Sequence, residues 1–307
     1  MGTSYNIKII DDYGVVKNKP YLKTQIDSIL NKINWHFSTY QDSSEINLFN
    51  SNTSQTPITV SSELYYLVSR SKEIFHLSNG SFDITIKPLV DIWGFSDSFK
   101  TPLIPKEFII DSIKQYVGLD KLILKKSTIQ KQNPNIQIDL NSIAKGWTVD
   151  RISQLFKSLK LSNYMIEIGG EIYISGHSQD KELWTIGIRN PNADIDNVLY
   201  VINLTDKAIA TSGTYQNFYY IDGNKYSHII NPKTGYPLKT DLVSAIIIAD
   251  NCMIADAIAT AVMLKGFNNG LHWINTLRDI ECLLITKLQD GELKKGKSKG
   301  FIYELIE

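Results

Sequence analysis

The sequence has little of what marks several large classes of protein. It holds only two cysteines among 307 residues, Cys252 and Cys282, and their spacing fits neither a metal site nor a redox motif. Both lie in apolar stretches, which is typical of packed thiols rather than of a disulfide. No segment reaches the roughly 18 apolar residues that a membrane helix needs, and no signal-peptide pattern is present. These features leave the compartment unassigned.

The charge shows no excess of either sign. Lys plus Arg and Asp plus Glu both number 32, so the formal net charge is zero. A generic nucleic-acid binder usually carries a basic excess, so no nucleic-acid partner is expected. One dense basic run spans residues 294–299 beside Asp290-Gly291, which predicts a solvated hairpin tip. The chain is 43% hydrophobic and 10% aromatic, enough for a real core.

Hydrophobic periodicity predicts several helices. Apolar residues recur at helical spacing between Ile26 and Phe37. A second helix is expected to begin at Ser61 or Ser62 and to end at Asn79-Gly80. A third should follow Asp139, and a fourth should cover about residues 255–264.

Strand signals occupy much of the remaining chain. Residues 166–174 read as two strands, or one bent strand, around Gly169-Gly170. Residues 218–230 read as a hairpin turning at Asp222-Gly223. The apolar run 243–249 predicts a strand buried on both faces. Because helices and strands mix without βαβ alternation, we expect the α+β class. The length allows one domain over residues 1–307, with two intertwined subdomains as a variant.

The segment around Asp256 and Thr260 is a candidate metal site. On a helix the two side chains are four residues apart and share a face. A carboxylate and a hydroxyl suit magnesium held jointly with a substrate phosphate. We expect Asp256 near the helix N-terminus, where the dipole favours a carboxylate. The alternative is an Asp that only stabilises its helix beside a packed Thr.

Residues 138–146 suggest an anion site. A strand leads into a helix expected to be capped by Asn141 or Ser142, with Lys145 in its first turn. The charge of Lys145 opposes the helix dipole there, and a bound phosphate would resolve that conflict. Asp139 offers a partner to Lys145 or an acceptor to a ligand. The alternative is an Asp139–Lys145 surface pair worth under about 1 kcal/mol. The spacing is not that of a P-loop.

Two further segments could contact a ligand. His228 ends a hairpin strand and leads into a loop rich in Pro and Gly, where it could serve as a general base. It could equally be a structural histidine. Phe82 and Asp83 follow a helix and could cradle a flat ring, or could belong to a helix C-cap and the core. Gly169-Gly170 would let the backbone approach a ligand, or form a tight turn.

Taken in order, these segments resemble one family over nearly the whole chain, the ApbE-like FAD:protein FMN transferases. No single segment is specific, but their joint occurrence is. The segments that carry the resemblance are residues 1–5, 37–40, 44–46, 49–50, 80–83, 88–89, 93–95, 139–146, 169–171, 210–213, 228–237, 255–256 and 259–260.

The resemblance implies roles for individual residues. It implies mixed and antiparallel sheets packed with helices, and FAD in a cleft between subdomains. His228 and Asp256 match catalytic positions, with His228 a candidate base. The positions that match flavin or FAD contacts are Met1, Tyr40, Ser81, Phe82, Asp83, Asp139, Lys145 and Ile230. The positions that match magnesium ligands are Ser142, Asp256 and Thr260.

The implied reaction is a Mg²⁺-dependent transfer of the FMN half of FAD to a Thr or Ser hydroxyl of an acceptor flavoprotein subunit, with release of AMP. Two alternatives use the same residues: an FAD pyrophosphatase giving FMN and AMP, and a flavin-binding protein without turnover. The resemblance also implies an exported lipoprotein at the periplasmic face of the bacterial inner membrane. A cytoplasmic relative is the alternative. Since Tyr5, Ile7 and Ile9 already alternate like a strand, we expect an export signal to have been removed upstream.

Overall fold

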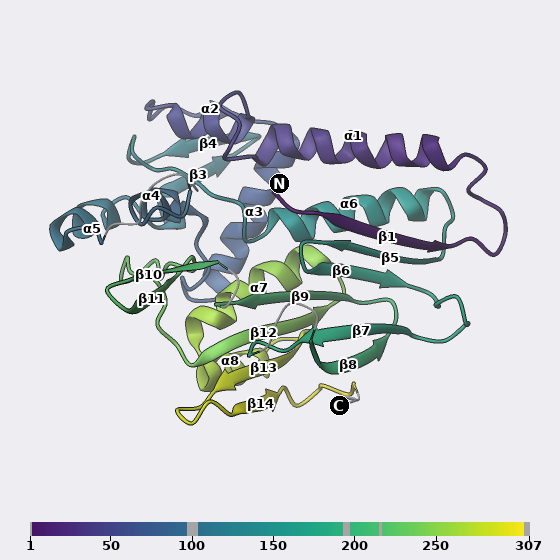
Figure 1. Cartoon of the computed structure of the whole chain (residues 1–307). Coiled ribbons are helices and arrows are strands. Elements are labelled where there is room, and N and C mark those ends of the chain that lie inside the picture. Colours follow the sequence, from purple (N-terminus) through teal and green to yellow (C-terminus); the bar gives the residue numbers. More distant parts are fainter. Residues whose placement is uncertain (1, 97–103, 193–196, 215–216, 304–307) are drawn as a thin grey trace.

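A computed structural model describes residues 2–96, 104–192, 197–214 and 217–303 (Figure 1). Helices and strands mix without regular alternation, which confirms the α+β class. The helices are α1 (Lys19–Phe37), α2 (Glu45–Ser51), α3 (Ser62–Leu77), α4 (Lys87–Ile92), α5 (Glu107–Lys114), α6 (Ala144–Ser158), α7 (Cys252–Lys265) and α8 (Phe267–Ile274), with 3-10 turns at Ile84–Ile86 and Leu119–Lys121.

A seven-stranded sheet forms the centre of the molecule. Its spatial order is β1 (Tyr5–Ile10), β5 (Asn163–Ile168), β6 (Glu171–Ser175), β9 (Ala208–Gly213), β12 (Leu242–Ala249), β13 (Glu281–Lys287) and β14 (Leu293–Lys297). Every neighbouring pair is antiparallel. Three smaller sheets accompany it: β2 (Ile58–Thr59), β4 (Thr128–Lys131) and β3 (Leu122–Lys125); β7 (Trp184–Arg189) and β8 (Val198–Leu204); β10 (Phe218–Ile221) and β11 (Asn224–Ser227).

Both faces of the large sheet are covered. Helices α6 and α7 pack on one face, and α1 lies against α6. The ribbon of β7 and β8 packs on the other face. Strand β12 serves both layers, since Ile247 lies in the helix-side core while Ile246 and Ile248 lie in the ribbon-side core. This confirms the strand buried on both faces.

Helix α7 runs through the core and begins earlier than expected. Ten of its residues are buried, and Asn251 caps it by accepting the Ile254 N–H. The helix starts at Cys252, so Asp256 lies in the second turn and not in the first. The expected dipole stabilisation of Asp256 is therefore weaker than we predicted, because the effect fades beyond the first turn. In the described part of the chain, no helix combines the length and apolar character that crossing a membrane requires.

Helix α6 also begins differently. Its N-cap is Ile143, which makes no side-chain capping bond, so the expected Asn141 or Ser142 cap was wrong. The Asn141 N–H and side-chain amide both donate to Asp139 instead. Gly146 explains how closely α6 meets α7. A Cβ there would lie 2.3 Å from the Cys252 carbonyl oxygen, so only glycine fits without movement.

Glycines with positive φ form the two turns that the sequence predicts. Gly169 and Gly170, with φ of 60° and 100°, join β5 to β6, so residues 166–174 form two strands. Asp222 and Gly223, with φ of 48° and 75°, turn the β10–β11 hairpin as predicted. The basic run corrects one prediction, since Lys294, Lys295 and Lys297 lie on the edge strand β14, beyond the tip of the hairpin. Lysines on an edge strand hinder pairing with another chain.

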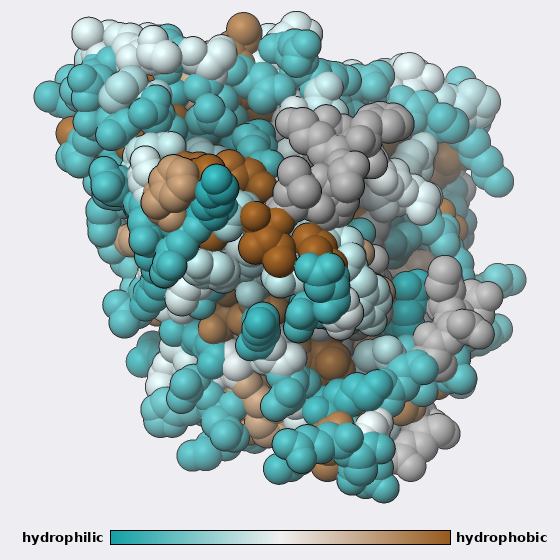
Figure 2. All heavy atoms as spheres, turned by 60° about the vertical axis from the view of Figure 1, so that its left-hand side comes forward, coloured by the Kyte–Doolittle hydropathy of each residue, from teal (hydrophilic) through white to brown (hydrophobic). Residues whose placement is uncertain are grey.

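A side region carries the α4–α5 pair and the β10–β11 hairpin (left in Figure 1). Its small core contains Leu89, Trp93 and Ile110 together with Ile230. In the view that brings this side forward, apolar side chains interrupt a largely polar surface (Figure 2). Exposed apolar residues on these elements include Phe108 and Phe218.

Candidate active site

A cavity of about 660 Å³ lies where this side region meets the helix-covered face of the sheet. That volume is in the range of small-molecule sites. The structure brings nearly all the sequence-predicted site residues to its lining: Tyr40, Ser81, Phe82, Asp83, Asp139, Ser142, Lys145, His228, Ile230, Asp256 and Thr260. Met1 lies outside the described residues. The common location is a finding, while the individual roles stay predictions.

Three charged side chains meet in the cavity. The Lys145 Nζ lies 2.9 Å from Glu171 Oε1 and 3.4 Å from Asp256 Oδ1. The other carboxylate oxygen of Asp256 accepts the Gly146 N–H at 3.0 Å. Glu171 and Asp256 are 2% and 4% exposed, and Glu171 Oε2 is buried with no hydrogen-bond partner. Two buried carboxylates thus share one ammonium.

The ionisation of this cluster follows from its burial. Burial alone would lower the pKa of Lys145, but Asp256 and Glu171 raise it above its usual value. Burial and then the charge of Asp256 raise the pKa of Glu171, against the opposing effect of Lys145. Lys145 is therefore a fixed cation. The cluster places this one cation beside two buried carboxyl groups, those of Glu171 and Asp256.

These contacts correct the expectation for the start of α6. Lys145 pairs with Glu171 and Asp256, so the alternative of an Asp139–Lys145 surface pair was wrong. In the first turn, the Ala144 N–H donates to Leu140 O and the Gly146 N–H to Asp256. The first turn of α6 thus binds a carboxylate of the chain itself, that of Asp256. Lys145 is the group in this turn that could contact a phosphate.

Two more buried carboxyl groups lie on the cavity wall. Asp139 accepts from Asn141, and burial raises its pKa above the ordinary value. Asp83 accepts from the Thr85 N–H at 2.8 Å and from the Leu119 N–H at 3.3 Å. Burial outweighs those bonds and raises the pKa of Asp83 to about 6. Asp83 thus holds the turn that places Phe82 on the wall.

His228 lies just beyond β11 on the cavity lining. Its Nδ1 is 3.0 Å from the Asn217 carbonyl oxygen. A carbonyl only accepts, so Nδ1 carries the proton and Nε2 of the neutral ring keeps its lone pair. Burial lowers the pKa of His228 below its usual value, and Lys145 adds to that effect against the Asn217 bond. The ring is thus a neutral acceptor at physiological pH.

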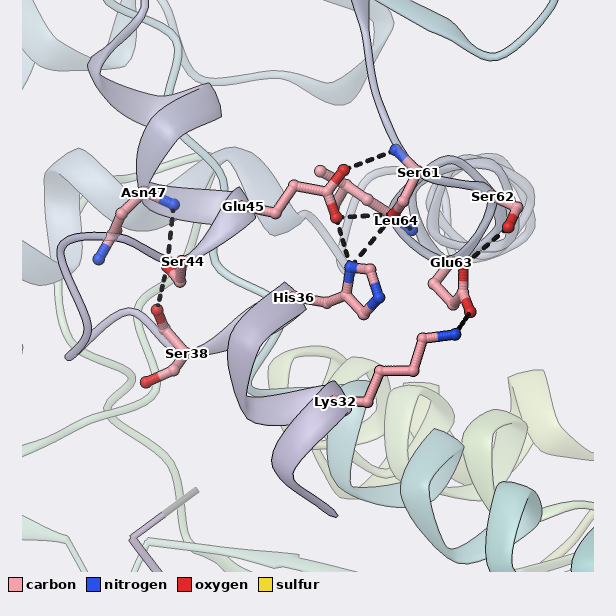
Figure 3. A network of polar contacts seen from close by, with 10 residues as sticks. All are labelled: Lys32, His36, Ser38, Ser44, Glu45, Asn47, Ser61, Ser62, Glu63 and Leu64. Carbon is pink, nitrogen blue, oxygen red and sulfur yellow. Dashed lines mark hydrogen bonds and ion pairs between the residues drawn. The ribbon is translucent and has the colours of Figure 1, made fainter. Parts of the chain in front are cut away.

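The rim that carries Tyr40 is held by α2. Ser44 Oγ donates to the Ser38 carbonyl at 2.7 Å, and the Asn47 side chain donates to the Thr39 and Gln41 carbonyls. Figure 3 shows Ser44 at the start of α2 between Ser38 and Asn47. Tyr40 itself is 64% exposed. The position of the rim therefore depends on α2.

Helix α2 is in turn fixed to its neighbours through Glu45. The carboxylate accepts from His36 at 2.5 Å and from the N–H and hydroxyl of Ser61 at 2.6 Å (Figure 3). His36 lies in the last turn of α1, Glu45 begins α2 and Ser61 caps α3, so three helix ends meet at one carboxylate. This network places the rim relative to the core.

Aromatic rings line the opposite wall. The rings of Phe95 and Tyr219 stack with centroids 4.5 Å apart, and the Tyr219 hydroxyl donates to the Trp93 carbonyl. Phe95, Phe218 and Tyr219 all border the cavity. Such a wall suits a flat ring system.

Sequence reasoning gave no role to some of these residues. Glu171 is the clearest case, since the sequence points to it only as part of the Gly-Gly-Glu segment that contributes to the resemblance. The sequence does place this carboxylate directly after a turn, at the start of a buried strand. A carboxylate in such a position needs a partner, and that need is the signal that could have identified it. Asn217 and Tyr219 carried no comparable signal.

The fold and this cavity define a class of α+β protein that can hold a ligand with both an anionic part and a flat ring. Comparison with known proteins makes this more specific: a family model described as ApbE matches residues 1–284, and the chain belongs to the ApbE family. A "FAD:protein FMN transferase" from Vibrio cholerae is 38% identical over 98% of this chain and 89% of its own length. One from Haemophilus influenzae is 32% identical over 97% and 88%.

Solved structures agree with the fold. The flavin transferase ApbE from Vibrio cholerae superposes with a TM-score of 0.90 at 36% identity, covering 98% of this chain and 95% of that one. The apo flavinyl transferase ApbE from Pseudomonas stutzeri gives 0.88 at 27% identity, covering 97% and 91%. The ApbE resemblance and the mixed fold expected from the sequence are confirmed.

The residues present fit the magnesium that the resemblance implies. The described residues contain no group of three or more His, Cys, Asp or Glu side chains placed to enclose a metal. They do provide a buried carboxylate at Asp256 and a hydroxyl one turn further along α7 at Thr260. An incomplete set of hard oxygen donors suits magnesium, which completes its shell with water and substrate phosphate.

Proposed function

We propose that this chain transfers the FMN half of FAD to a Thr or Ser hydroxyl of an acceptor flavoprotein subunit and releases AMP, in a Mg²⁺-dependent reaction. The name of the relatives supports an enzyme acting on FAD and a protein. The observation that carries the proposal is the buried Lys145–Glu171–Asp256 cluster, which shares a cavity with His228 and an aromatic wall.

The chemistry is a displacement at phosphorus, so positioning and charge neutralisation provide most of the acceleration. The acceptor hydroxyl oxygen forms a bond to the FMN-side phosphorus of FAD. The bond between that phosphorus and the bridging oxygen breaks, and AMP leaves with the electron pair. Ser142, Asp256 and Thr260 would hold magnesium, which when bound supplies neutralisation of the pyrophosphate charge.

Lys145 and His228 supply the remaining functions. The Lys145 ammonium, fixed by two carboxylates, contacts a phosphate oxygen and offsets its charge. The Nε2 of His228 accepts the proton of the attacking hydroxyl, because Nδ1 is engaged with Asn217. Burial keeps this ring neutral and ready to accept.

The experiment incubates purified chain with FAD and magnesium, with and without a domain bearing an acceptor Thr, and follows products by mass spectrometry. The proposal predicts a gain equal to FMN on the acceptor, lost with EDTA. Free FMN and AMP without an adduct would instead establish the pyrophosphatase. Intact FAD in both samples, with binding confirmed, would leave a flavin-binding protein.

We also propose that the full-length protein acts at the periplasmic face of the inner membrane as a lipoprotein, as the resemblance implies. Fractionation of cells that express the native gene tests this. Recovery with periplasmic membranes supports it, and recovery in the cytoplasmic fraction supports the cytoplasmic alternative.

A further inference from the structure

In the mechanism above Glu171 only helps to hold Lys145, yet it is one of the most buried acidic residues that the structure describes. It begins β6 directly after the Gly169-Gly170 turn, and its side chain borders the cavity. One carboxylate oxygen contacts Lys145, and the other has no partner. Burying such a group is costly unless it is paired or hydrogen-bonded, and here only one of its two oxygens is.

The ammonium of Lys145 is shared unequally. Its distance to Glu171 is 2.9 Å, a full hydrogen bond, while its distance to Asp256 is 3.4 Å. Asp256 Oδ2 accepts the Gly146 N–H, so Oδ1 is the oxygen that remains for a cation. The stronger hold of Glu171 on Lys145 therefore leaves Asp256 Oδ1 only weakly engaged.

We propose that Glu171 is a positioning residue that draws Lys145 away from Asp256 and so keeps Asp256 Oδ1 available to the divalent cation. Without Glu171, Asp256 is the one carboxylate left within 4 Å of the ammonium in the part of the chain that the structure describes, and Lys145 closes onto it. A cation must then displace an ammonium to bind. This inference rests on the magnesium site of the proposed function and adds the residue that sets its affinity.

A double-mutant cycle on magnesium affinity tests the inference. Calorimetry with MgCl₂ is run on the whole chain, with and without FAD, for wild type, Glu171→Leu, Lys145→Met and the double variant. We expect Glu171→Leu to weaken magnesium binding about tenfold, a loss of about 1.4 kcal/mol in binding free energy. In the Lys145→Met background the same change should alter affinity by less than about twofold, because the competing ammonium is gone.

Two further variants make the test specific. Glu171→Gln keeps an acceptor oxygen for Lys145 and should bind magnesium with affinity between wild type and Glu171→Leu. It also serves if Glu171→Leu fails to fold. Glu167→Leu is the matched control, since Glu167 lies on the neighbouring strand β5 and contacts the Gly170 N–H outside the cluster. It should leave magnesium affinity unchanged.

Each contrary result has a distinct meaning. Wild-type affinity in both Glu171 variants would overturn the inference alone. An equal loss from Glu171→Leu with and without Lys145 would also overturn it, because Glu171 would then be a direct ligand. A wild-type chain that binds no magnesium with or without FAD would overturn the proposed metal site together with the inference.

Discussion

Among single residues, Asp256 is central to the proposed metal site. One of its carboxylate oxygens lies near Lys145, and the other accepts the Gly146 N–H. We expect Asp256→Ala to reduce magnesium-dependent transfer at least about a hundredfold, the scale of losing one electrostatic group that acts on a transition state. Single-turnover transfer at saturating FAD measures this. Asp256→Asn keeps an acceptor for Gly146, so it controls for loss of structure. Near-wild-type transfer by the Ala variant in magnesium would refute the metal site.

The role of His228 as a base predicts how the transfer rate depends on pH. A base must be neutral to accept a proton, and burial lowers the pKa of His228 below its usual value of 6.5. Activity should therefore be full at pH 7 and fall only as the pH drops below 6.5. His228→Asn should lose about 10² to 10⁴ in rate and lose this acid limb. A pH profile of single-turnover rates checks both, and an unchanged acid limb in the variant would assign the titration to another group.

For the elements, the contact between α6 and α7 decides how the cluster forms. Gly146→Ala places a Cβ 2.3 Å from the Cys252 carbonyl oxygen, so the helices must separate. We expect a loss of about 2 kcal/mol in the free energy of unfolding, as for other overpacked sites. Denaturant unfolding measures it. Gly2→Ala is the control, because a Cβ there meets nothing within 4 Å and should change stability little.

Because α2 holds the rim of the cavity, weakening that contact should lower the affinity for FAD. Asn47→Ala removes both side-chain bonds to the rim that carries Tyr40. Without these bonds the rim is held less firmly, and a cost of about 1 kcal/mol to restore its position on binding would weaken FAD binding about fivefold. Flavin fluorescence titration follows it. Ser51→Ala is the control on the same helix, since the Ser51 hydroxyl donates to the Leu48 carbonyl on the exposed side of α2. Equal affinities in the two variants would remove the rim from the FAD site.

Elements with local signals were predictable, and their ends were less so. The β10–β11 turn followed from Asp222-Gly223, because positive φ at both positions is a local property. The start of α6 could not be predicted in this way. Asn141 donates to Asp139 in place of capping the helix, and the Asp256 carboxylate from α7 accepts an N–H of the first turn. Tertiary partners of this kind leave no trace in local spacing.

For the whole molecule, the sequence alone could predict the α+β class but not the order of the strands. β1 pairs with β5 although Tyr5 and Ile168 are far apart in the chain. The convergence of Lys145, Glu171 and Asp256 depends on that topology, because each comes from a different element. The resemblance predicted which residues share a cavity, while the partner of Lys145 required the structure.

Attack at the FMN-side phosphorus of FAD decides which phosphate stays with the acceptor. The most direct test uses two FAD samples, one with ³²P in the FMN-side phosphate and one with ³²P in the AMP-side phosphate, each incubated with the chain, magnesium and an acceptor domain. We expect label on the acceptor only from the first sample, and labelled AMP in solution only from the second. Label reaching the acceptor from the AMP-side phosphate would contradict it.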